Sequence, residues 1–175
     1  MPTVAQQLTG IRNTMTKVVI PGMDPTDRFA QEQAGLIVAT LNWILDVQGS
    51  EYSYEATENR EYRTMAAQLA DTAAAPEHHG RAALLRAAAT EDSGSELPPL
   101  DALRAHTRRL KALADEFYAA LAVGTDAGTG AARDLLLSAA RGQARRDQSW
   151  FRMTGFPKDI EGDIASVLAA GNGAT

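Results

Sequence analysis

The chain has 175 residues and a net charge of −5, and its 33 alanines and 17 leucines far outnumber its 13 valines and isoleucines. This balance favours helices and excludes an all-β fold, while the acidic charge argues against a nucleic-acid partner. Because the sequence contains no cysteine, it also excludes disulfides, thiolate metal sites and thiol nucleophiles.

Two amphipathic helices are predicted in the first 50 residues. The first ends before Pro21-Gly22, and its apolar residues recur at spacings of 4, 3, 4 and 3, which keeps them on one helix face. These residues are Val4, Leu8, Ile11, Met15 and Val18. The second begins with Asp24 as N-cap before Pro25 and ends near Gly49. Its predicted stripe consists of Phe29, Gln33, Leu36, Ile37, Thr40, Leu41, Ile44 and Val47.

A third helix is predicted from Ser50 to the run before Pro76. Its stripe is apolar at Leu69 and Met65 but becomes polar toward the N-terminal end, a change that marks this segment for attention. A shorter alanine-rich helix is predicted over residues 78–89.

The second half of the chain alternates loops and helices. Loops are predicted over residues 90–99 and 124–130, which are rich in Gly, Ser and Pro. Between them a helix carries a stripe of Leu103, His106, Leu110, Leu113, Phe117 and Leu121. A last long helix is predicted from about Ala132 to Trp150.

These elements predict an all-α protein, an up-and-down bundle of about five to six helices. We expect one bundle domain over residues 1–154 and a C-terminal tail over 155–175 that is either a short helix or disordered. The N-terminal segment lacks the apolar core of a signal peptide, and the most apolar run is too short to span a bilayer. We therefore expect a cytoplasmic protein with no membrane contact.

Familiar catalytic motifs are absent from the sequence. No Glu-x-x-His pair is present, so a di-metal carboxylate bundle is rejected, and we expect no metal and no cofactor. No Gly-x-Ser-x-Gly elbow marks a nucleophile. The glycines of residues 124–130 lack the Gly-Lys-Ser/Thr ending of a phosphate loop. Catalytic residues stay unknown.

The best polar constellation lies at the start of the third helix, where Tyr54, Glu58 and Tyr62 share a helix face at spacings of four. A Glu in such a position either pairs with an arginine or serves a ligand or proton transfer. His106 interrupts an apolar stripe, so it is either a hydrogen-bonded residue at the bundle edge or a general base. We take Tyr54, Glu58, Tyr62 and His106 as candidate ligand-binding residues.

The run from Ala39 to Leu45 and the acidic segment 51–61, with Glu58-Asn59-Arg60-Glu61, resemble a group of bacterial helical proteins without an assigned activity. Members of that group are encoded beside aminoglycoside-phosphotransferase-like kinases and acyl-CoA dehydrogenases. The resemblance covers about the first 70 residues. It implies an accessory role in the context of acyl-thioester metabolism, and it carries over no catalytic residue.

The long amphipathic N-terminal helix, the abundant alanine and the lack of a catalytic motif favour a non-enzymatic interaction or accessory protein. We expect it to self-associate as a homodimer, the commonest oligomer, and it could also bind another protein. The alternative is a small-molecule binding protein or enzyme with a polar site between helices, for a ligand such as acyl-CoA or another phosphate-bearing molecule.

Overall fold

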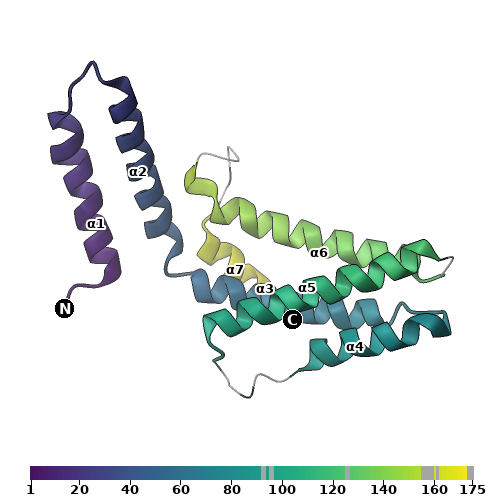
Figure 1. The fold of residues 1–175 in the computed structure, drawn as a ribbon. Helices are drawn as coiled ribbons and strands as arrows, with labels where there is room; N and C mark the ends of the chain where they lie inside the picture. Colours follow the sequence, from purple (N-terminus) through teal and green to yellow (C-terminus); the bar gives the residue numbers. More distant parts are fainter. Residues whose placement is uncertain (92–93, 95–96, 125–126, 155–159, 161, 173–175) are drawn as a thin grey trace. The chain divides into compact units, whose positions relative to one another are not determined.

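The computed structural model describes residues 1–91, 94, 97–124, 127–154, 160 and 162–172. Its described residues form seven α-helices and no strand (Figure 1). The helices are α1 (Val4–Thr14), α2 (Arg28–Val47), α3 (Glu51–Ala70), α4 (His79–Thr90), α5 (Leu100–Val123), α6 (Thr129–Trp150) and α7 (Ile164–Asn172). The all-α prediction is confirmed, but the predicted count of five to six helices is too low.

The additional helix is α7. It lies in the C-terminal tail, for which the sequence allowed either a short helix or disorder. The Asp163 carboxylate caps it by accepting a hydrogen bond from the backbone N–H of Ser166 at 2.8 Å. Its apolar side chains Ile164 and Leu168 are buried. A nine-residue helix is marginal by itself, so the cap and this burial explain why periodicity alone did not establish it.

The chain divides into two compact units. Unit 1 contains residues 1–51 and 146–175, and unit 2 contains residues 52–145. The boundaries fall at the start of α3 and within α6. The expectation of one domain over 1–154 with a tail over 155–175 stays a prediction, and residues 155–159 and 161 of that tail lie outside the described residues.

In unit 1, α1 and α2 form an antiparallel hairpin (Figure 1). A reciprocal capping box starts α1, because Thr3 accepts from the Gln6 N–H and the Gln6 side chain accepts from the Thr3 N–H. The N-cap of α2 is Asp27, which accepts from the Ala30 N–H at 3.0 Å. The predicted cap, Asp24, is wrong because its carboxylate is engaged earlier, in the turn, by the N–H and hydroxyl of Thr26.

The face that α2 buries differs from its predicted stripe. Ala34, Leu41 and Val47 are buried, and only the last two belong to the stripe. Phe29 and Leu36, also in the stripe, are 72% and 55% exposed. The hairpin supplies only one neighbour along this part of α2, so one side of the stripe stays in contact with solvent.

The C-terminal half of α2 packs against the segment that follows α6. The Trp43 ring stacks on Phe151 with 5.9 Å between ring centroids, and its indole N–H donates to the Trp150 carbonyl at 2.9 Å. Arg152 forms two hydrogen bonds to Asp46, one of them 3.0 Å long. This carboxylate is the main reason that the pKa of Arg152 is raised.

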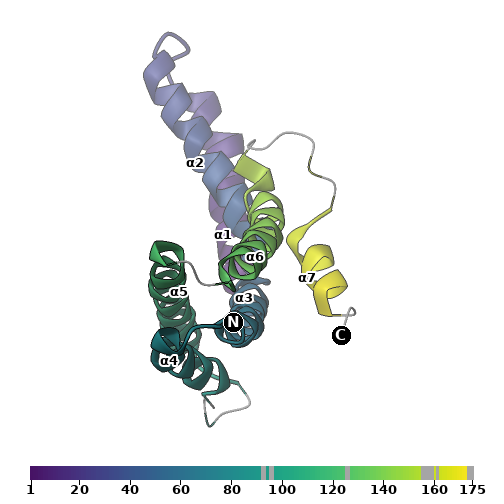
Figure 2. The same cartoon turned by 90° about the vertical axis from the view of Figure 1, so that its right-hand side faces the viewer.

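Unit 2 contains α4, α5 and most of α3 and α6, and successive helices run antiparallel (Figures 1 and 2). Its core has four fully buried leucines and a phenylalanine surrounded by alanines, which let the helices approach closely. The largest of these side chains are Leu69, Leu85, Leu110, Phe117 and Leu121. The loops predicted over 90–99 and 124–130 include residues 92–93, 95–96 and 125–126, which lie outside the described residues.

Candidate functional site

The polar end of α3 lies inside unit 2. Thr57, Glu58 and Asn59 are all buried, and Glu58 is only 7% exposed. Three consecutive buried polar residues on one helix need partners on neighbouring helices, because an unsatisfied buried polar group costs about 1–3 kcal/mol. Their partners define what this end of α3 can do.

Glu58 and Tyr62 meet at Lys111 of α5. The Lys111 ammonium donates to Glu58 Oε1 at 2.9 Å and lies 4.7 Å from the centroid of the Tyr62 ring. The Tyr62 hydroxyl in turn donates to Gln143 Oε1 of α6 at 2.7 Å. Pairing of the glutamate was one of the two alternatives left open by the sequence, but Lys111 was not the expected partner.

Two other predicted residues lie outside this cluster. Tyr54 is half-buried one turn before Glu58 on α3. Between these two residues Glu55 accepts a hydrogen bond from Arg104 Nε at 2.8 Å. His106 belongs to a second network, so the structure brings together Glu58 and Tyr62 and separates His106 from them.

Both ring nitrogens of His106 are engaged. Its Nε2 lies 2.9 Å from the Ala88 carbonyl oxygen, which can only accept, so we assign the proton to Nε2. Its Nδ1 then accepts from the Asn59 amide at 3.0 Å. The same amide lies 3.0 Å from the Thr107 hydroxyl oxygen. This arrangement joins α3, α4 and α5 and supports the structural interpretation of His106 as a hydrogen-bonded residue.

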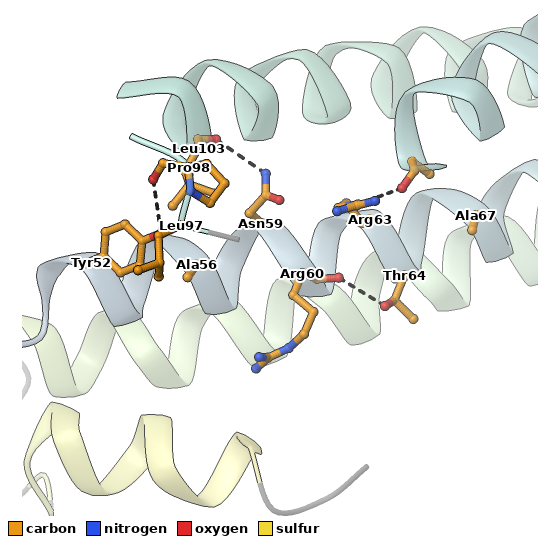
Figure 3. Close-up of a pocket in the computed structure, with 11 residues that line it drawn as sticks. Tyr52, Ala56, Asn59, Arg60, Arg63, Thr64, Ala67, Leu97, Pro98 and Leu103 are labelled. Carbon is orange, nitrogen blue, oxygen red and sulfur yellow. Dashed lines mark hydrogen bonds between the residues drawn. The ribbon is translucent and has the colours of Figure 1, made fainter. Parts of the chain in front are cut away.

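A groove of about 610 Å³ opens on another face of α3 in unit 2 (Figure 3). None of the four predicted site residues lines it. Its lining residues come from α3, the end of α4, the segment before α5 and the start of α5. They are Tyr52, Ala56, Asn59, Arg60, Arg63, Thr64, Ala67, Ala89, Leu97, Pro98 and Leu103.

The two arginines of the groove do not converge on one point. Arg63 donates from Nε to the Ala89 carbonyl at 2.8 Å, and Figure 3 shows Arg60 extending to the other side of α3. At one end the Tyr52 hydroxyl donates to the Pro98 carbonyl at 3.1 Å. The spacing of three and four residues from Tyr52 to Ala67 could have indicated a shared face, but the sequence carried no signal for what lies opposite.

In the part of the chain that the structure describes, His, Asp and Glu side chains do not gather in groups of three or more that could hold a metal ion. None of its helices combines the length and the apolar character needed to cross a membrane.

Comparison with known protein families, with curated proteins and with solved structures found no match to this chain. The resemblance of the first 70 residues to bacterial helical proteins therefore stays a prediction.

Proposed function

We propose that this protein is a non-enzymatic interaction protein that self-associates as a homodimer. The observation that supports the proposal is a concentration of exposed large apolar side chains on the α1–α2 hairpin. A helical hairpin with such a surface is typical of an element that completes its packing by association. The residues are Val4, Ile11, Val18, Phe29, Leu36 and Ile37.

The free energy gained by burying these apolar side chains is comparable with the free-energy cost of association. Complete burial of one large apolar side chain stabilises by about 1.5–3 kcal/mol, and these six are about half to three-quarters exposed. Covering them on both copies of a dimer contributes on the order of 10 kcal/mol. Association costs about 4–15 kcal/mol, so burial of this surface offsets most of that cost. A dimer in the micromolar range needs about 8 kcal/mol beyond the cost, which requires further contacts around these residues.

The polar residues of unit 2 support a structural rather than a catalytic role. Glu58, Tyr62 and His106 each have a partner on another helix, and these contacts hold α3 to its neighbours. An accessory role, a bacterial source and a cytoplasmic location are further parts of the proposal, and they rest on the sequence.

Sedimentation velocity over concentrations from below 1 to above 100 μM tests self-association, a range chosen from the affinity scale of ordinary complexes. We expect a concentration-dependent shift from the 18.7 kDa chain to a species of twice that mass. A chain that stays monomeric throughout would contradict the proposal.

The groove of unit 2 favours one alternative function, the binding of a small molecule. Its lining is largely apolar, with Tyr52, Arg60 and Arg63 at its edges. A thermal-shift screen with acyl-CoA, nucleotides and sugar phosphates tests this. A ligand at 100 times its dissociation constant stabilises by about 2.7 kcal/mol. The variant Ala56→Trp, which fills the groove, should abolish the shift, whereas the exposed substitution Gln68→Ala should leave it unchanged.

A further inference from the structure

We infer that two copies of the chain pair through one apolar face of the α1–α2 hairpin, with the four helices of the two hairpins forming a bundle. We call this surface the hairpin face. This inference rests on the proposed self-association and names its interface. The hairpin face consists of Val4, Ile11, Val18, Phe29, Leu36 and Ile37.

Helix geometry places the exposed apolar residues of α1 and α2 on one side of the hairpin. Each residue advances about 100° around its helix. On α2 the exposed Phe29 and Leu36 lie more than 90° from the covered row that includes Ala34 and Leu41. On α1 the half-buried residues Ala5, Thr9 and Arg12 define the side that faces α2. The exposed Ile11 is displaced from that side by a similar angle and in the same rotational sense. In an antiparallel pair, equal displacements of this kind bring both groups to the same face.

The spacing within the hairpin face is that of a coiled coil. Val4 and Ile11 are seven residues apart on α1, as are Phe29 and Leu36 on α2. Val18 follows Ile11 at the same interval but lies in the π-helical turn Met15–Val19 after α1. A seven-residue apolar repeat keeps one row of side chains facing a partner helix along its length. The hairpin face therefore has the pattern of a helix–helix interface as well as an apolar composition.

The hairpin face supplies a large part of the area that a stable dimer needs. Its row runs about 21 Å from Val4 to Val18 and about 17 Å from Phe29 to Thr40, because α2 beyond Thr40 packs on residues 150–152. Two adjacent helices are about 20 Å wide, so the projected area of the face is about 400 Å², and the accessible area of a ridged surface is larger. A stable interface buries about 800 Å² on each partner, so the residues around the face complete the contact.

The charges near the hairpin face favour a second copy over a membrane surface. All six residues of the face are uncharged, and residues 1–51 contain three basic and five acidic residues. Helices that bind anionic lipid surfaces are instead rich in Lys and Arg. Gln33 and Thr40 are exposed polar residues beside the apolar positions of α2. The Thr40 hydroxyl donates to the Leu36 carbonyl of its own helix and can only accept from a partner. The Gln33 amide can both donate and accept, so it can pair with the same amide of an identical face.

A two-fold dimer presents the same patch on both partners. Apolar positions around one amide that both donates and accepts, that of Gln33, satisfy this requirement by themselves. In such a bundle Gln33 occupies an inner position of α2, where a polar residue fixes the register of the helices at a cost in stability.

The experiment compares two matched leucine substitutions by sedimentation equilibrium. Leu36 lies on the hairpin face and is 55% exposed, whereas Leu84 lies on α4 of unit 2 and is 63% exposed. We expect Leu36→Glu to weaken the dimer by about 100-fold, since it places a charge in an apolar interface. Leu84→Glu should dimerise like the unaltered chain. Circular dichroism of both variants checks that the monomer folds, which the exposure of both leucines favours.

A second variant tests the same interface by strengthening the dimer instead of weakening it. Gln33→Leu should tighten the dimer by about tenfold, because it replaces a polar inner position by an apolar one. If Leu36→Glu and Gln33→Leu both leave the dissociation constant unchanged, the hairpin face is not the interface, although self-association itself stands. If the unaltered chain is a monomer, both proposals fail. A monomer that floats with vesicles of anionic phospholipid would assign the hairpin face to a membrane surface and overturn the inference.

Discussion

The α1–α2 hairpin of unit 1 and the helices of unit 2 make different use of the same sequence pattern. On α5, the stripe residues Leu103, Leu110, Phe117 and Leu121 are all buried. On α1, an equally regular stripe includes no buried residue. The comparison shows that apolar periodicity predicts a helix and the side it presents, whereas burial depends on how many other helices lie against that side.

The number of neighbours explains the difference. In unit 2 the core cluster combines side chains from α3, α4, α5 and α6, so an apolar stripe is covered from several directions. In the hairpin α1 packs on α2 and the turns that join them. Two helices in contact cover only part of each stripe, and the remaining apolar surface is available to a partner.

The largest expected loss of stability comes from truncating a side chain in the core of unit 2. Phe117→Ala removes a side chain that is only 1% exposed and should lower the free energy of unfolding by about 3–5 kcal/mol. Its counterpart on the hairpin, Ile11→Ala, should cost less than about 1 kcal/mol at a dilution where the chain is monomeric. Urea unfolding followed by circular dichroism measures both. Equal losses would show that α1 is buried as deeply as α5.

A smaller effect is expected from the network around His106. Asn59→Ala removes the donor to His106 Nδ1 and to the buried Thr107 hydroxyl. It should destabilise unit 2 by about 1–3 kcal/mol, because both acceptors lose their partner. Gln68→Ala, at an exposed position of the same helix, is the matched control and should be nearly neutral. If the two variants unfold at the same urea concentration, the network does not hold α3 to α5.

The contact between Lys111 and Glu58 should contribute less to the stability of unit 2 than the network around His106. A double-mutant cycle with Lys111→Met and Glu58→Gln should give a coupling free energy of about 1 kcal/mol, because the lysine is partly exposed and the pair is screened by water. The cycle is measured by urea unfolding at low and at high salt. A coupling that is zero at both salt concentrations would show that the buried glutamate gains nothing from this lysine.

The smallest expected effect is the loss of the Asp163 cap at the start of α7, in unit 1, when its carboxylate is protonated at low pH. Hydrogen bonds from Ser166 lower the pKa of Asp163 below its usual value. The ionised cap therefore stabilises α7 at pH values above the pKa of the unfolded chain, and this contribution is lost as pH falls through the lowered pKa. NMR titration of the Asp163 carboxyl carbon should follow the Ser166 amide shift. In Asp163→Asn, the acid-dependent shift of Ser166 should disappear, and its persistence would contradict the assignment.

The sequence indicated that polar residues at core spacing on α3 must find partners, and of the four predicted residues Glu58 and Tyr62 meet at one side chain. The partners themselves did not follow from the sequence. Lys111 belongs to a basic run of α5 that has the composition of a solvated face, yet it reaches Glu58 and Tyr62. The groove beside Tyr52 did not follow from the sequence either, since it depends on where Leu97, Pro98 and the start of α5 lie against α3.

By itself the sequence determined α1 to α6, because the 3.6-residue period, the punctuation by Pro and Gly and the abundance of alanine act locally along the chain. The tertiary structure alone decided which apolar stripes are covered, that the tail contains α7, and which lysine meets Glu58. These outcomes depend on contacts between residues far apart in the sequence, such as positions 58 and 111. Periodicity can say that a helix face must be covered, but only the arrangement of the other helices says what covers it.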